Sequence, residues 1–136
     1  MPDRTREDRV AEFHRAMEVS VADPLTHDLL ALRLRLLNEE VAELAESVAI
    51  YLGQREKGRS DADLAAERAH MLKELADVQY VVSGFAVTFG LPLEAAFDRV
   101  HTSNMSKLVN GKPLKRDDGK VLKGPNYQPP TLDDLV

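Results

Sequence analysis

Residues 26–56 read THDLLALRLRLLNEEVAELAESVAIYLGQRE. Apolar residues recur along this stretch in alternating steps of three and four, which is the period of a helix that packs in a bundle. Thr26 is a residue type that caps helix N-termini, and Gly58 marks the other end, so we expect one long helix here. The predicted apolar seam of this helix consists of Leu30, Leu34, Leu37, Val41, Leu44, Val48 and Tyr51.

The chain on either side of this helix shows the same helical period. A shorter helix is predicted over about residues 4–19, and its apolar face consists of Val10, Phe13 and Met17. A second long helix is predicted to begin near Ser60, because Asp63 three residues later completes the pattern of a capping box. Its predicted seam consists of Met71, Leu75, Val78, Val82, Phe85 and Phe89.

The last predicted helix is short. Gly90 stands where a left-handed residue often ends a helix, and Pro92 suits the first turn of the helix that follows. This fourth helix is expected to end near residue 107. Two long helices and two shorter ones predict an all-α fold, a bundle of about four helices over about residues 4–107.

The composition changes after the predicted bundle. The last 29 residues contain three glycines and four prolines, so we expect a loop-rich arm over about residues 108–136. Asn110-Gly111 and Asp118-Gly119 are turn signals that permit a short hairpin near residues 113–122. Because 136 residues fit one domain, bundle and arm are predicted to form a single domain over residues 1–136.

Composition also bears on the classes of protein to which the chain can belong. A net charge of −5 argues against a nucleic-acid surface. No apolar run approaches the roughly 18 residues that a membrane helix needs, so no membrane is expected as a partner. The charged N-terminus lacks the apolar stretch of a signal peptide. With no cysteine, disulfides, thiolate metal sites and cysteine nucleophiles are excluded, and a reducing cytoplasm is the expected location.

Two acidic pairs stand on the two long predicted helices. Glu40 and Glu43 are spaced i, i+3, which places their side chains on one helix face, and Glu74 and Asp77 share this spacing. Both pairs lie on or beside stripes that are otherwise apolar. If the two helices pack antiparallel, the four carboxylates can face one another. Each like-charge pair at about 4 Å would then cost on the order of 4 kcal/mol at an effective dielectric near 20.

Carboxylates gathered in this way either take up protons or share a cation. Oxygen ligands without cysteine favour a hard ion such as Mg²⁺, Mn²⁺ or Ca²⁺, and Mg²⁺ with open water positions is the usual partner of phosphate substrates. A single Glu-x-x-Glu pair on a helix is more often a solvated surface feature. The metal hypothesis therefore depends on the combination of two pairs beside two seams.

These residues resemble a known family. The two acidic pairs, in this order, are similar to the metal motif of the MazG-like all-α nucleoside triphosphate pyrophosphohydrolases, which include dimeric dUTPases and phosphoribosyl-ATP pyrophosphohydrolase. The string HTSNMSK from His101 to Lys107 and the string DGKVLKGPNY from Asp118 to Tyr127 resemble the subgroup with dUTP-hydrolysing members. The resemblance covers roughly residues 10–135.

The resemblance implies a Mg²⁺-dependent nucleoside triphosphate diphosphatase, with Mn²⁺ as a substitute ion. The enzyme would split a (deoxy)nucleoside triphosphate into the monophosphate and pyrophosphate, with dUTP as the favoured substrate and house-cleaning of nucleotide pools as its role. By the same resemblance, the metal would be held by Glu40, Glu43, Glu74 and Asp77, and the attacking water would be activated by Glu39. The phosphates would be bound by Asn104, Lys107, Lys120 and Lys123. The nucleoside pocket would be lined by Phe13, His14 and Tyr127.

Two alternative functions stay open at this point. One is a catalytically silent helical module that binds nucleotide or metal, and the other is a structural helical adaptor. The intact acidic set together with Glu39 favours the enzyme. Two apolar seams on a short chain leave apolar surface to spare, and members of the resembled family assemble, so we expect a homodimer or a dimer of dimers.

Overall fold

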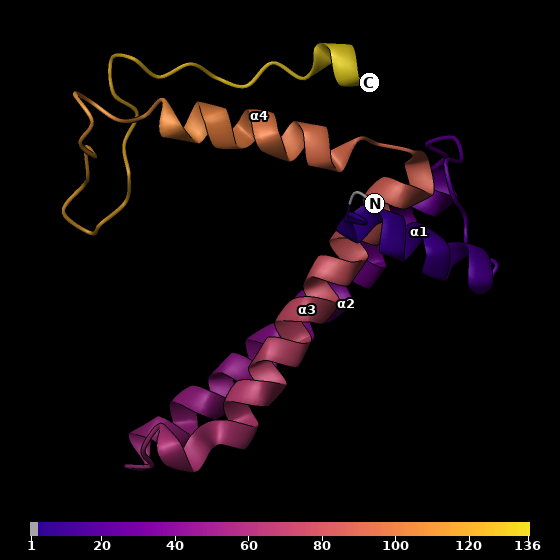
Figure 1. The fold of residues 1–136 in the computed structure, drawn as a ribbon. Helices are drawn as coiled ribbons and strands as arrows, with labels where there is room; N and C mark the ends of the chain where they lie inside the picture. Colours follow the sequence, from indigo (N-terminus) through magenta and orange to yellow (C-terminus); the bar gives the residue numbers. More distant parts are fainter. Residues whose placement is uncertain (1–2) are drawn as a thin grey trace. The chain divides into compact units, whose positions relative to one another are not determined.

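The computed structural model describes residues 3–136 and contains four α-helices (Figure 1). In chain order they are α1 (Arg6–Ala16), α2 (His27–Glu56), α3 (Ala65–Phe89) and α4 (Leu93–Met105), with 3₁₀ turns at Ala62–Leu64 and Asp133–Leu135. No strand occurs within residues 3–136. The predicted all-α fold of about four helices is confirmed.

The chain forms two compact units, and each is described by itself. The first unit extends to Gly90 and holds α1, α2 and α3, whereas the second begins at Leu91 and holds α4 and the tail. Gly90 ends α3 in the left-handed conformation predicted for it (φ 64°). The prediction of a single domain, with a bundle to residue 107 and an arm after it, stays a prediction.

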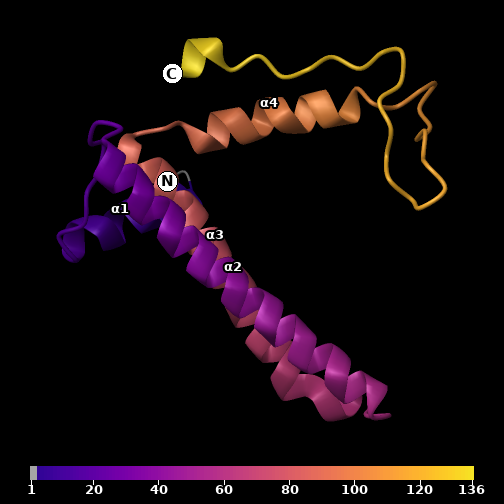
Figure 2. The same cartoon turned by 180° about the vertical axis from the view of Figure 1, so that it is seen from behind.

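In the first unit, α2 and α3 form a long antiparallel hairpin and lie side by side along their length (Figure 2). Thr26 caps α2 as predicted, because its hydroxyl accepts from the backbone N–H of Leu29. The capping box at the hairpin's turn is also present: Asp63 N donates to Ser60 Oγ, and Ser60 N donates to Asp63 Oδ2, both at 3.3 Å. It opens a 3₁₀ turn, however, and α3 begins only after that turn.

Three of the seven residues in the predicted seam of α2 are exposed, so the prediction is wrong at these positions. Leu34, Val41 and Val48 are 52%, 47% and 38% exposed, and they are called the apolar α2 stripe below. The residues one position earlier, Arg33, Glu40 and Ser47, are buried or half-buried and face α3 instead. The side of α2 that packs on α3 is therefore partly polar, which is typical of functional positions. Because these polar residues interrupt the apolar period, the period alone did not identify the side that packs.

α3 departs from its prediction at one seam position, since Leu75 is exposed. α1 also turns a different face inward. Val10 is buried as predicted, but Phe13 and Met17 are exposed, and Glu7 and His14 take their place on the inner face. Thr5 caps α1 through a capping box with Asp8, so the helix begins two residues later than predicted.

In the second unit, the tail folds back along α4. Ser103 Oγ donates to the carbonyl of Gln128 (2.7 Å), and Arg99 donates to the carbonyl of Thr131 (2.9 Å) and to Asp134 Oδ2 (2.9 Å). The predicted hairpin is reduced to isolated bridges, one of which pairs residues 115 and 121 around the turn at Gly119. Loop structure therefore dominates the arm, as expected.

No single helix within residues 3–136 is both long enough and apolar enough to cross a membrane. In the part of the chain that the structure describes, one bent pair, α3 with its preceding turn and α4, reaches that length and composition when both are taken together.

Candidate metal centre

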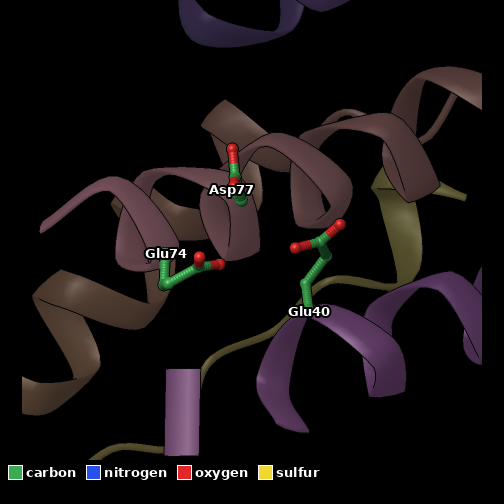
Figure 3. A group of neighbouring side chains, drawn as sticks. All are labelled: Glu40, Glu74 and Asp77. Atoms are coloured by element: carbon green, nitrogen blue, oxygen red, sulfur yellow. The ribbon is translucent and has the colours of Figure 1, made fainter. Parts of the chain in front are cut away.

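Three carboxylates meet between α2 and α3. Glu40 comes from α2, and Glu74 and Asp77 come from successive turns of the facing helix α3 (Figure 3). One ligand atom from each residue lies within 4.8 Å of the other two. The antiparallel hairpin brings position 40 opposite positions 74 and 77, and the i, i+3 spacing keeps the two α3 carboxylates on one face. Three of the four predicted ligands are therefore brought together.

Burial leaves these carboxylates short of partners. Glu74 is only 4% exposed, and the Oε2 atoms of Glu74 and Glu40 are both buried without a hydrogen-bond partner. A buried carboxylate oxygen without a donor is costly. A cation that accepts several oxygen ligands would remove this cost, and an all-carboxylate donor set suits a hard divalent ion. The residues present therefore fit a metal site.

The electrostatics of the group agree with this reading. The pKa of Glu40 is raised above its ordinary value, first by burial and then by the neighbouring carboxylates of Glu43 and Asp77. On the open side, Lys73 Nζ lies 2.7 Å from Asp77 Oδ2 and 3.7 Å from Glu74 Oε1. Its hydrogen bond to Asp77 is the main cause that raises the pKa of Lys73. The cluster thus attracts positive charge even from its own helix.

Two predicted acidic residues lie outside the three-carboxylate group. Glu43 is exposed, although it is close enough to Glu40 to contribute to the raised pKa of that carboxyl group. Glu39 is also exposed and lines a shallow depression along α2 with Asn38 and Ala42. The roles predicted for these two residues stay predictions.

The residues predicted for a nucleoside pocket in the first unit sit where α1 meets α3. Phe13 packs edge-to-face against Tyr80, with ring centroids 5.5 Å apart. His14 is buried, and its Nδ1 donates to the carbonyl of Ser20 (2.9 Å), because a carbonyl can only accept. The other ring nitrogen, Nε2, lies next to Gly84.

Sequence reasoning missed Arg33. Its side chain is 6% exposed, its Nε has no partner, and its guanidinium group lies against Gly84 beside His14. Burial lowers the pKa of this guanidinium group. A charged residue seven positions before Glu40, within a run of leucines, was the signal that could have found it. The absence of a side chain at Gly84 makes room for this guanidinium group.

The predicted phosphate-binding residues belong to the second unit. Lys107 and Lys123 lie over the ring of Tyr127, with their Nζ atoms 6.0 Å and 4.8 Å from its centroid, so the unit gathers these three residues. Asn104 near the end of α4 and Lys120 in the loop are exposed, and neither joins that group.

Residues 10–104 match the family described as phosphoribosyl-ATP pyrophosphohydrolase, and the match contains the whole three-carboxylate group. The chain belongs to this family. The family lies within the MazG-like all-α nucleoside triphosphate pyrophosphohydrolase superfamily, so the predicted family is confirmed. Its pyrophosphohydrolases cleave a phosphoric anhydride bond of a nucleotide and depend on metal in general.

The family match does not extend over the whole chain of this pyrophosphohydrolase. It ends at Asn104, so it does not include the tail with Lys107, Lys120, Lys123 and Tyr127. No curated protein matches the chain.

Proposed function

We propose that this chain is a Mg²⁺-dependent nucleoside triphosphate pyrophosphohydrolase, which converts a (deoxy)nucleoside triphosphate and water into the monophosphate and pyrophosphate. The observation that carries the proposal is the pair of buried, partnerless carboxylate oxygens of Glu40 and Glu74 within the three-carboxylate group. A helical adaptor gains nothing from such an arrangement, whereas a phosphate-processing site needs it.

Glu40, Glu74 and Asp77 would hold the metal, with Glu43 as a fourth ligand from the open side. The bound metal would neutralise phosphate charge and lower the pKa of a water molecule. Glu39 is next to the first ligand and reached by solvent, so it is the candidate base that takes the proton of the attacking water.

The basic tail supplies the candidate phosphate contacts. Lys107, Lys120 and Lys123, with Asn104, would stabilise the negative charge that develops on the pyrophosphate leaving group. Tyr127 would contribute an aromatic face to the nucleoside, as Phe13 and His14 would from α1. The choice of dUTP rests on the resemblance of this tail to dUTP-hydrolysing proteins, whereas the matched family carries phosphoribosyl-ATP in its description.

We further propose that a second copy of the chain covers the apolar α2 stripe. The stripe repeats every seven residues along one side of α2, which is the spacing that packs against another helix. The buried apolar residues of the described chain are few, namely Val10, Leu64, Ala86, Val87 and Phe89. A homodimer or a dimer of dimers would supply the missing core.

The first experiment measures pyrophosphate release from a panel that includes dUTP, the other ribo- and deoxynucleoside triphosphates and phosphoribosyl-ATP, with Mg²⁺, Mn²⁺ or EDTA. We expect pyrophosphate and the matching monophosphate in equal amounts, only with metal, and fastest from dUTP. If only phosphoribosyl-ATP is hydrolysed, the proposed reaction class is correct, and phosphoribosyl-ATP is the substrate in place of a nucleoside triphosphate. No turnover of any nucleotide would favour a silent nucleotide-binding or metal-binding module.

The carboxylate assignment has its own test. Glu74→Gln and Glu43→Gln are expected to lower kcat at least about a hundredfold while circular dichroism shows an unchanged helix content, because each removes one charged ligand. Glu46→Gln is the matched control, since Glu46 is exposed on α2 and outside the group. Normal turnover in Glu74→Gln would remove the metal assignment.

A further inference from the structure

Lys73 is the one lysine or arginine among residues 3–136 with a side-chain nitrogen within 4.0 Å of the three-carboxylate group. It contacts two of the three carboxylates at once, Asp77 at 2.7 Å and Glu74 at 3.7 Å. We propose that Lys73 is a mobile counter-cation: it neutralises the carboxylates while they hold no metal, and it moves to the phosphate groups of the substrate when the metal is bound. The second step rests on the function proposed above.

The surroundings of Lys73 distinguish it from an ordinary surface pair. An exposed i, i+4 pair of one lysine and one acid contributes little, since water solvates both groups well. Here one ammonium group contacts two carboxylates of a group of three whose ligand atoms lie within 4.8 Å of one another. Two members of that group, Glu40 and Glu74, have a buried oxygen without a partner. The nearest other basic group is His70, whose Nε2 lies 3.5 Å from Glu74 Oε1 and which is a cation only when protonated.

The side chain of Lys73 is free to move. It is 64% exposed, whereas the Glu74 side chain that it contacts is 5% exposed. The Glu74 carboxylate is therefore fixed in the helix interface and the Asp77 carboxylate lies at its edge, 35% exposed, and the ammonium group reaches both from solvent on a flexible stem. Rotation of that stem moves the charge away without any change in α3.

A divalent cation at the same carboxylates makes this movement favourable. Its two positive charges would repel an ammonium group that stays on Asp77, a few ångströms away. Phosphate oxygens near the metal would offer the displaced ammonium group a new anionic partner, and the stem of Lys73 begins one residue before Glu74 and four residues before Asp77. Lys73 thereby exchanges carboxylate contacts for phosphate contacts.

The first part of the test measures Mg²⁺ binding to the full chain by isothermal titration calorimetry without nucleotide. Lys73→Met is expected to bind Mg²⁺ about fivefold more tightly than wild type, because the substitution removes the repulsion between the ammonium group and the ion. The factor corresponds to the salt-screened repulsion of a unit charge and a dication roughly 5 Å apart in water. Lys57→Met is the control of equal charge change, because Lys57 is exposed at the far end of α2.

Unchanged or weaker Mg²⁺ binding by Lys73→Met would overturn the counter-cation role while leaving the metal centre intact. Absence of Mg²⁺ binding by wild type would overturn the metal centre itself, and the proposed function with it. Without metal, Lys73→Met is also expected to unfold at a lower temperature than Lys57→Met, since its carboxylates lose their neutralising charge.

The second part measures pyrophosphate binding in saturating Mg²⁺. Lys73→Met should bind pyrophosphate several-fold more weakly than wild type, and Lys73→Arg should restore most of the affinity. Tighter Mg²⁺ binding together with weaker pyrophosphate binding is a combination that general damage to the fold does not produce. Pyrophosphate binding that is unaffected by Lys73→Met would overturn the transfer to phosphate.

Discussion

Charge at individual residues decides the character of the carboxylate site. Glu40 has a raised pKa because it is buried next to other acids, and Glu74 is almost fully buried. In the metal-free protein these groups repel one another across the helix interface. This repulsion lowers the free energy of unfolding of the metal-free protein at the positions where an ion would bind. Such a local loss of stability is a common property of functional sites.

Glu40→Gln tests this relation through pH. Because the folded protein binds a proton at Glu40 more tightly than the unfolded chain does, Glu40 favours folding below its ordinary pKa, and the benefit is lost as pH rises through the raised value. At pH 7 without metal, Glu40→Gln should be more stable than wild type by on the order of 1 kcal/mol, since one like charge is removed. Urea unfolding measures the difference.

Two further conditions complete that experiment. Well below the ordinary pKa of a glutamate, where Glu40 is protonated in both states, the advantage of Glu40→Gln should disappear. Saturating Mg²⁺ at pH 7 should reverse the order, because only wild type keeps the full ligand set. A metal-free Glu40→Gln protein that is less stable than wild type at pH 7 would contradict the prediction.

Gly84 is a second residue whose role is local. A Cβ at Gly84 would overlap Nη2 of Arg33 and lie 3.2 Å from Nε2 of His14. Gly84→Ala should lower the free energy of unfolding by about 1–3 kcal/mol, the usual cost of overpacking a filled interior. Gly53→Ala is the control, since no atom lies within 4 Å of its added Cβ, and it should be neutral or stabilising. Equal effects of both substitutions in thermal unfolding would argue against the contact.

At the scale of elements, the tail is held to α4 by a few polar contacts. Arg99 provides two of them, to the carbonyl of Thr131 and the carboxylate of Asp134. The hydrogen bond from Arg99 is the main cause of the lowered pKa of Asp134, so this pair persists well below neutral pH. The tail is therefore an ordered strap within its unit, anchored at residues 128–136.

Arg99→Met should release that strap. Amide hydrogen exchange over residues 128–136 should speed up markedly, while overall stability falls by no more than about 1 kcal/mol, because the ion pair is exposed. Arg116→Met removes the same charge from a pair with Asp118 that lies within the loop, so it serves as the control. If exchange in the tail is the same in both variants, Arg99 is not the anchor.

At the scale of the whole molecule, the chain leaves much apolar surface uncovered. α2 exposes a regular stripe, and α3 exposes Leu72 and Leu75. Exposed apolar area of this kind marks interaction surfaces. The assembly proposed above is the simplest way to cover it, since each copy brings the same surface.

Val41→Glu should weaken that assembly, because it places a charge in the middle of the apolar α2 stripe. Light scattering at micromolar concentration should show a smaller particle than wild type, and the melting temperature should lose its dependence on protein concentration. Val121→Glu is the control, since it makes the same change at an exposed valine of the tail. The particle mass measured by light scattering should be the same for this variant as for wild type. A wild-type monomer at these concentrations would contradict the proposal outright.

The sequence by itself determined the helices and several of their ends. Thr26, Ser60 and Gly90 act through hydrogen bonds or backbone conformations of nearby residues, so their effects can be derived from local pattern. The i, i+3 spacing of the acidic pairs is equally local. For the same reason the all-α class could be predicted in full, and the family could be recognised from the metal motif.

Only the tertiary structure decided which faces of those helices meet. The rotation of α2 by one residue replaces Val41 with Glu40 at the interface, and the same rotation buries Arg33 against Gly84. The apolar period could not show this, because α2 carries two apolar stripes and the one with polar interruptions is the one that packs on α3. Contacts between residues distant in the chain chose between the stripes, and that choice places three carboxylates together.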